Sequence, residues 1–215
     1  MPDGAKVCDV GTDHGYLAAA LYKSGRVKSV IATDINEKPL AHALESIKRL
    51  KADGVDLRLC DGLAAVNDGE ADTIIILGMG GEVIAGILSR APWVKSNDIT
   101  LILQPMTSAW ELRKYLYLNG FCIVNEPTLS EKGKVYSVIV AKFVGKSREF
   151  DMFDCCVGKI GVQSESDIMY LKKQYKRCNQ CALKMENIQE KRSEYKEYKA
   201  VAQKLESILE EHNAI

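Results

Sequence analysis

The sequence predicts an α/β fold, with a mostly parallel, doubly wound sheet closed by an antiparallel hairpin and followed by a C-terminal helical hairpin. Three observations support this prediction. Short apolar runs alternate with amphipathic stretches between residues 6 and 119, as in repeated β-α units. Two of the apolar runs open into glycine-rich turns. From residue 166 onward there is no glycine or proline, and apolar residues follow a helical 3–4 spacing.

Composition sets the size of the fold but leaves the partner open. The 215 residues are 47% hydrophobic, enough for one sizeable core and a smaller second unit. Basic and acidic residues both number 29, so the total charge gives no sign of a nucleic-acid partner. However, residues 20–51 and 111–148 each hold seven basic and three acidic side chains, whereas residues 52–110 hold three and eight. The two basic stretches could form a face that attracts a polyanion, or they could be solvated helix faces.

The cysteines indicate a reducing environment. Seven cysteines are scattered along a chain without a signal peptide or a long apolar run, so we expect free thiols, a cytoplasmic protein and no membrane segment. Only Cys178 and Cys181 form a C-x-x-C pair, and the three histidines (His14, His42 and His212) provide no second pair of zinc ligands. We therefore expect no metal site, and we expect the pair to be packing residues.

The segment from Val7 to Leu17 is typical of a buried strand, a glycine turn and the start of a helix. Gly11 and Gly15 permit positive φ angles and close backbone approach, and the helix N-terminus presents free N–H groups to a ligand. Their G-x-x-x-G spacing lacks the middle glycine of the dinucleotide fingerprint, which disfavours a hydride-transfer cofactor. The turn suits a charged ligand without a phosphate.

Three acids follow the first three expected strands. The expected elements are strand Lys6–Val10, helix 14–24, strand Ser29–Asp34, helix 39–53 and strand Val55–Cys60. Because the carboxyl ends of parallel strands share one edge of a sheet, Asp9, Asp34 and Asp61 should converge there. A cationic amine, a ribose and an adenine amine could each contact one of them. Asp34 could instead cap the next helix, but the three acids together favour a nucleoside site.

A second glycine turn follows the β-branched run Thr73–Leu77, which is typical of a central strand buried on both faces. The turn is Gly78-Met79-Gly80-Gly81-Glu82. Its glycines would let a substrate and a cofactor touch, because no side chains hold them apart. Alternatively, they only begin the next helix.

The rest of the expected sheet completes five β-α units and a closing hairpin. Its elements are strand Ile99–Leu103, helix Ser108–Asn119 and strands Phe121–Pro127 and Val135–Val144. We expect the polar segment Thr128–Lys134 to join the last two strands as an antiparallel pair. This arrangement places ligands at the carboxyl ends of the strands.

The C-terminal third predicts a separate helical unit. Residues 145–165 suit a connector docked on the domain, so we divide the chain into residues 1–146 and residues 147–215. Two apolar stripes, one residue out of phase, flank a charged run at 190–194, which predicts a helical hairpin packed as a coiled coil. A single bent helix pairing with another chain is the alternative. The one basic cluster here is Lys172, Lys173, Lys176 and Arg177.

Five motifs in this order and spacing resemble a known family. They are Val10-Gly11-Thr12-Asp13-His14-Gly15-Tyr16-Leu17, Asp34-Ile35-Asn36, Asp61-Gly62-Leu63, Gly78-Met79-Gly80-Gly81 and Leu103-Gln104-Pro105. The combination resembles the TrmK family of bacterial tRNA (adenine(22)-N1)-methyltransferases, which use S-adenosyl-L-methionine. The resemblance covers nearly the whole chain. It implies a Rossmann-like class I methyltransferase domain with a C-terminal coiled-coil hairpin, and methyl transfer to N1 of adenine 22 in tRNA.

Together with this resemblance, the residue pattern gives two sets of site residues. The expected cofactor-binding residues are Asp9, Gly11, Thr12, Gly15, Asp34, Ile35, Asp61, Gly62 and Gly78. The expected catalytic residues are Asp13, His14, Tyr16, Met79, Gly80 and Glu82.

The chemistry of a ring nitrogen explains the second set. Neutral adenine N1 has a lone pair and needs no strong base, whereas the methylated product is cationic and would be stabilised by Asp13 or Glu82. His14 and Tyr16 could stack on or hydrogen-bond a flipped adenine, or they could be packed in the core. Enzymes that methylate exocyclic amines carry a polar-Pro-Pro-aromatic motif at the position of 79–81, and its absence favours a ring nitrogen.

One departure from the family qualifies these expectations. Members usually carry a helical stretch before the first strand, whereas here Met1 to Ala5 leads straight into it. We therefore expect a less covered cofactor pocket and a smaller tRNA surface. The alternatives are a non-catalytic coiled-coil interaction protein with a residual nucleoside pocket and a nicotinamide-dependent oxidoreductase. The expected protein is a monomer that binds tRNA.

Overall fold

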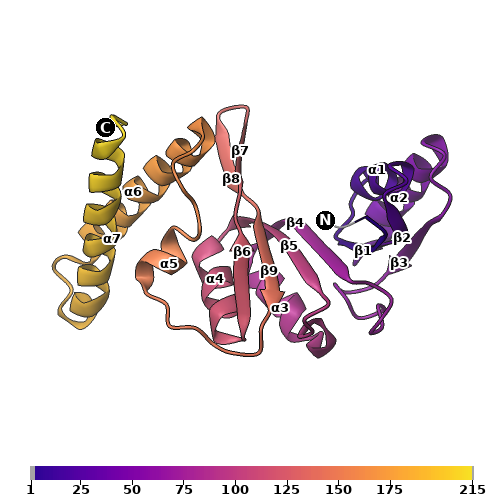
Figure 1. Cartoon of the computed structure of the whole chain (residues 1–215), viewed down its shortest axis with the longest axis horizontal. Helices are drawn as coiled ribbons and strands as arrows, with labels where there is room; N and C mark the ends of the chain where they lie inside the picture. The colour runs from indigo at the N-terminus through magenta and orange to yellow at the C-terminus, as the bar shows by residue number, and fades with distance from the viewer. Residues whose placement is uncertain (1–2, 215) are drawn as a thin grey trace.

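The computed structural model describes residues 3–214. A seven-stranded sheet carries helices on both faces, and a pair of long helices stands at the opposite end of the molecule from β1–β3 (Figure 1). The strand order is β3-β2-β1-β4-β5-β9-β6, with parallel pairing up to β5 and antiparallel pairing of β9 with both β5 and β6. The predicted fold class is confirmed.

The secondary structure alternates between strands and helices through the first two thirds of the chain. The strands of the large sheet are β1 Ala5–Val10, β2 Val27–Asp34, β3 Val55–Leu59, β4 Thr73–Gly80, β5 Thr100–Thr107, β6 Phe121–Asn125 and β9 Ile139–Phe143, and those of a separate hairpin are β7 Thr128–Glu131 and β8 Lys134–Ser137. The helices are α1 Tyr16–Lys23, α2 Glu37–Arg49, α3 Gly81–Ser89, α4 Ala109–Leu118, α5 Met152–Cys156, α6 Glu165–Met185 and α7 Arg192–Glu211, with short 3-10 turns η1 Pro92–Val94 and η2 Gln189–Lys191.

The alternation of side chains along the strands explains the layers. Val7 packs with Leu17 and Leu21 of α1, whereas its neighbour Cys8 joins the larger core formed with α3 and α4. The β-branched run of β4 is buried on both sides, since Ile74, Ile75 and Ile76 are all at most 5% exposed. Burying each such side chain contributes about 1.5–3 kcal/mol, so the centre of the sheet is its most stable part.

Two helices begin or end where the backbone turns left-handed. The first helix was expected from residue 14 but begins at Tyr16, because Gly15 has a φ of 70°. The second was expected at residues 39–53 but spans Glu37–Arg49, with Pro39 tolerated in its first turn. It ends before Lys51, whose φ is 54°.

Three further expectations about the sheet are corrected. No helix follows β3, because the described residues 60–72 form turns, so there are four strand–helix units rather than five. The fourth strand continues through the second glycine turn to Gly80, pairing irregularly with β5. The segment Thr128–Lys134 is not a plain loop. It forms β7 and the turn into β8, so the expected strand Val135–Val144 is divided between two sheets.

The C-terminal hairpin is confirmed, and a single bent helix is wrong. Helices α6 and α7 pack along each other around a core of their own that includes Leu171, Cys178, Leu205 and Leu209. The chain reverses at η2, where the apolar stripe changes phase. Cys178 is fully buried as a packing residue. Supercoiling of the pair stays a prediction.

A buried arginine ties this hairpin to the sheet. Arg113 of α4 and Glu126, which follows β6, form an ion pair of 2.6 Å with both side chains fully buried. Arg113 also donates to the carbonyls of Cys155 and Cys156 in α5 and to the Tyr170 hydroxyl in α6. The expected connector thus contains a helix, α5, which is fixed by this network.

Candidate active site

The first glycine turn is held against β2. The backbone N–H groups of Gly11 and Thr12 donate to the carbonyl of Thr33 at 2.8 and 2.9 Å. Gly11 has a φ of 75°, and a Cβ atom there would lie 2.2 Å from Cε of Met79. The positive φ favours glycine here, and a Cβ would in addition displace the terminal methyl of the flexible Met79 side chain. At Gly15 a Cβ would lie 3.0 Å from that of Ala43 in α2.

Asp9 is a buried carboxylate with one side-chain partner. It is 4% exposed, and its Oδ2 accepts a hydrogen bond of 2.7 Å from the Thr12 hydroxyl. Burial raises the pKa of Asp9 to about 6, because the charged form is poorly solvated. A cationic ligand group beside Asp9 would be favoured, since it would stabilise the ionised form.

Asp34 connects the end of β2 to the first turn. Its Oδ2 accepts from the backbone N–H of Asp13 at 3.2 Å, and its Oδ1 accepts from that of Asn36 at 2.9 Å. The side chain of the next residue, Ile35, is 62% exposed. Asp34 therefore orders both the turn and the start of α2 at the sheet edge.

The third acid of the expected set is engaged differently. Asp61 is exposed, and its carboxylate pairs with Arg90 at 3.0 Å. Gly62, with a φ of 61°, packs against Ile87, and its carbonyl accepts from the Thr33 hydroxyl at 2.9 Å. Parallel pairing brings the ends of β1, β2 and β3 to one edge as expected, but the carboxylate of Asp61 is in an ion pair.

Three rings stack beside the first turn. His14 lies between Tyr16 and His42, with ring centroids 5.7 and 5.6 Å apart and interplanar angles of 22° and 7°. The Tyr16 residue is 54% exposed and the His14 side chain is 50% exposed, so the core-packing alternative for both is wrong. Asp13 lies on the same turn, and its Oδ2 is 3.7 Å from Nε2 of His14. These side chains offer a base an accessible stacking surface.

The second glycine turn is joined to β5. Gly78 has a φ of 79°, and its N–H donates to Oε1 of Gln104 at 3.0 Å. A Cβ on Gly78 would meet nothing within 4 Å, so this position is open to a ligand. Gly80 pairs with Thr107, and Glu82 is exposed in the first turn of α3. Two of the glycines do begin the next helix, since Gly80 is the N-cap of α3 and Gly81 is its first residue, packed against Ser108.

Sequence reasoning missed two residues of this site. His42 extends the ring stack from α2, and no pattern in the sequence pairs it with His14. Gln104 holds the second glycine turn, and only its place in the motif Leu103-Gln104-Pro105 pointed to it. The structure brings the two glycine turns together through Met79 and Gly11, whereas Asp61 and Glu82 have exposed side chains.

The comparisons with known proteins agree with this geometry. A family described as "Methyltransferase domain" matches residues 1–139. With its doubly wound sheet and glycine turns at the strand ends, the chain is a Rossmann-like methyltransferase. It is 32% identical over 177 residues to the tRNA (adenine(22)-N(1))-methyltransferase of Bacillus subtilis, covering 80% of this chain and 74% of the relative. The chain belongs to the TrmK family of tRNA (adenine(22)-N1)-methyltransferases.

Two solved structures extend the similarity to the C-terminal hairpin. The crystal structure of the B. subtilis m1A22 tRNA methyltransferase TrmK has a TM-score of 0.77 at 25% identity, over 97% of this chain and 94% of that one. A Streptococcus pneumoniae protein, described as a candidate tRNA (m1A22) methyltransferase in complex with S-adenosyl-L-methionine, has a TM-score of 0.79 at 29% identity with the same coverage.

No helix within residues 3–214 is long and apolar enough to span a bilayer. Over the same residues, no three His, Cys, Asp or Glu side chains are grouped so that they could hold a metal ion. The seven cysteines are free thiols, as predicted.

Proposed function

We propose that this protein transfers a methyl group from S-adenosyl-L-methionine to N1 of adenine 22 in tRNA. The observation that carries the proposal is the contact between the two glycine turns, where Met79 lies over Gly11 next to the buried Asp9. Family membership and the similarity to a complex with S-adenosyl-L-methionine support it.

The residues at the sheet edge fit this cofactor. It carries positive charge on its sulfonium and amino groups, and the poorly partnered carboxylate of Asp9 would be stabilised by such a charge. Asp34 offers carboxylate oxygens to ribose hydroxyls at the end of β2. Gly11, Thr12 and Gly15 would form the backbone wall of the pocket, Gly78 leaves space for a ligand, and Ile35 and Gly62 complete the expected pocket. The cofactor supplies the electrophilic methyl group when it is bound.

The remaining chemistry is positioning and charge stabilisation. Tyr16 and His14 would stack on the flipped adenine, and Met79 with Gly80 would border the place where the two ligands touch. Asp13, on the same turn as the ring stack, would stabilise the cationic product, with Glu82 as the second carboxylate. No general base is needed, because N1 of neutral adenine holds no proton.

Incorporation of labelled methyl groups tests the proposal. The intact protein should transfer label from S-adenosyl-L-methionine to bulk tRNA, and Asp34→Ala should lose cofactor affinity and activity. Circular dichroism checks that the variant is folded, because Asp34 also accepts hydrogen bonds from the backbone of Asp13 and Asn36. Cofactor binding without any incorporation into tRNA would contradict the enzymatic role.

We also propose that the protein acts on tRNA as a cytoplasmic monomer without a metal, with its two units divided near residue 146. Light scattering should give the mass of one protein copy for the purified chain, and the mass of one protein copy plus one tRNA for the mixture. Activity should be the same with and without a chelator. A dimer in solution would contradict the monomer, and loss of activity with chelator would contradict a metal-free reaction.

A further inference from the structure

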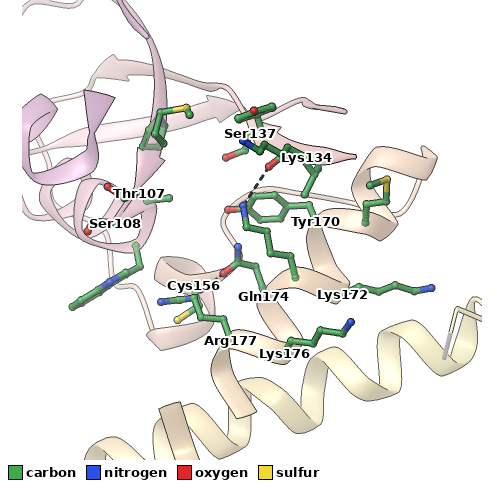
Figure 2. Close-up of a pocket in the computed structure, with 18 of the residues that line it drawn as sticks. Thr107, Ser108, Lys134, Ser137, Cys156, Tyr170, Lys172, Gln174, Lys176 and Arg177 are labelled. Atoms are coloured by element: carbon green, nitrogen blue, oxygen red, sulfur yellow. Dashed lines mark hydrogen bonds between the residues drawn. The ribbon is translucent and has the colours of Figure 1, made fainter. Parts of the chain in front are cut away.

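A groove of about 890 Å³ lies between the sheet domain and the C-terminal hairpin. One wall is the end of β5 and the start of α4, a second is β8, and the third is one face of α6 (Figure 2). In Figure 2, Thr107 and Ser108 lie opposite the side chains that α6 contributes. The groove therefore joins three segments that are distant in sequence.

The groove is strongly cationic. Five basic side chains line it, and none of the described lining residues is acidic; the five are Lys134, Lys172, Lys173, Lys176 and Arg177. Within residues 3–214, none of these five forms an ion pair with a carboxylate within 4 Å. Lys173 donates to the carbonyl of Val135 at 3.3 Å, which joins α6 to β8. Their charges are therefore available to an anionic ligand.

Arg177 is the one guanidinium among the described residues that line the groove, and it lies beside the thiol of Cys156. Its Nε donates to Oε1 of Gln174 at 3.0 Å, but the buried Nη2 has no hydrogen-bond partner. Because Nη2 is enclosed by protein and Arg177 as a whole is only half-buried, a ligand in the groove would contact the accessible remainder of this side chain. A guanidinium in this position suits the oxygens of a phosphate.

The groove lies one strand away from the second glycine turn of the candidate active site. Its first wall includes Pro105 and Thr107, which pair in the sheet with Met79 and Gly80 of the second glycine turn. This wall is largely apolar and includes Met106 and Trp110, which can contact ribose and base faces. A polyanion lying in the groove would thus have its next nucleotide beside the glycine turns.

We propose that this groove binds the sugar-phosphate backbone of the substrate RNA, with Arg177 anchoring one phosphate and Lys134, Lys172 and Lys176 contacting its neighbours. The inference rests on the proposed function and adds where the RNA lies. It predicts that the C-terminal hairpin contributes to substrate affinity rather than to the chemical step.

Direct binding of tRNA, measured by filter retention without the cofactor, tests this proposal. Arg177→Gln should weaken binding about tenfold and lower the slope of log K against log salt by about 0.7–0.9. The double variant Lys172→Gln/Lys176→Gln should lower the slope by about twice that amount; Lys176 is exposed and Lys172 is half-buried, and circular dichroism checks that the variant is folded. The matched control is Lys184→Gln/Lys196→Gln, two exposed hairpin lysines outside the groove.

Kinetics and fluorescence distinguish the groove from the active site. The groove variants should raise KM for tRNA and leave both kcat and the Kd for S-adenosyl-L-methionine unchanged. In a Trp93→Phe background, Trp110 is the only tryptophan, and tRNA should change its emission in the parent but much less in Arg177→Gln.

Two results would overturn the inference. Groove variants that bind tRNA as tightly as the Lys184/Lys196 control would exclude this path for the RNA, as would a parent protein that binds no tRNA. If the parent binds tRNA through the groove but transfers no methyl group, the proposed function fails and the groove assignment stands.

Discussion

The hydrogen bonding of its charged side chains distinguishes the structural part of this molecule from its ligand-facing part. At the domain junction, all three guanidinium nitrogens of Arg113 are hydrogen-bonded, and Glu126 accepts from Arg113 and from the backbone of Lys159. In the ligand-facing part, Asp9 has one side-chain partner, and Arg177 has one bond and an open nitrogen. An arginine and an acid thus have all their hydrogen bonds at the junction, whereas the arginine and the acid of the ligand-facing part lack some of theirs.

The difference shows what each region is built for. A buried ion pair with all its donors used fixes geometry, and here it fixes the hairpin relative to the sheet. A buried charge short of partners reduces stability, and it is retained where a ligand completes it. Asp9 lies at the proposed cofactor edge, and Arg177 lies in the proposed RNA groove.

Breaking the junction should have the largest effect on folding. Arg113→Met leaves the carboxylate of Glu126 buried without its cation, which should lower the free energy of unfolding by about 3–5 kcal/mol. Urea denaturation followed by circular dichroism measures this. Arg113→Met/Glu126→Gln should recover part of the loss. A single variant as stable as the parent would show that the network does not hold the junction.

The second effect is a pH dependence due to Asp9. Its pKa is about 6 in the folded protein against 3.8 unfolded. Between these values the folded state keeps a proton that the unfolded state releases, so the free energy of unfolding should fall by about 2 kcal/mol as pH rises from 4 to 6, and level off above about pH 7. Asp9→Asn should lack this fall in denaturation series across that range. If the stability of Asp9→Asn falls with pH as steeply as that of the parent, the pH dependence belongs to another group.

The third effect separates backbone strain from ligand contact. Gly11→Ala and Gly25→Ala both place alanine at positive φ, which should cost each about 1–2 kcal/mol of stability. Only Gly11 has Met79 in the way, whereas a Cβ on Gly25 meets nothing within 4 Å. Calorimetric titration should therefore show weaker S-adenosyl-L-methionine binding for Gly11→Ala alone. Equal losses of affinity would mean that the contact between the turns is unimportant.

The smallest effect on folding belongs to the second arginine. Arg177→Met removes one hydrogen bond but also an unsatisfied donor, so its free energy of unfolding should stay within about 1 kcal/mol of the parent. Measured in the same denaturation assay as Arg113→Met, this variant shows how much less Arg177 contributes to stability than Arg113. A loss as large as that of Arg113→Met would place Arg177 in the structural network.

The sequence predicted what local patterns and strand order determine. The glycine turns, the edge with Asp9 and Asp34 and the break between α6 and α7 all followed from spacing and periodicity. The β7–β8 hairpin did not, because its two-residue turn, Lys132-Gly133, has two positive φ angles but lacks the usual Asn or Asp.

Long-range contacts of single side chains were also beyond sequence reasoning. Arg113 belongs to a stretch interpreted only as basic, yet its partners lie 13 to 57 residues away along the chain. The groove has the same origin, because Lys134 and the α6 cluster meet only in the folded chain. His42 reaches His14 from another helix, and helical spacing does not reveal that stack.

The most direct test of the account uses two tRNA transcripts that differ only at position 22. Mass spectrometry of nuclease digests should detect 1-methyladenosine after incubation of the adenine-22 transcript with the protein and S-adenosyl-L-methionine, and none with guanine at that position. The adenine-22 product should disappear with Asp34→Ala. Methylation of both transcripts, or of neither by a protein that binds the cofactor, would contradict the assignment.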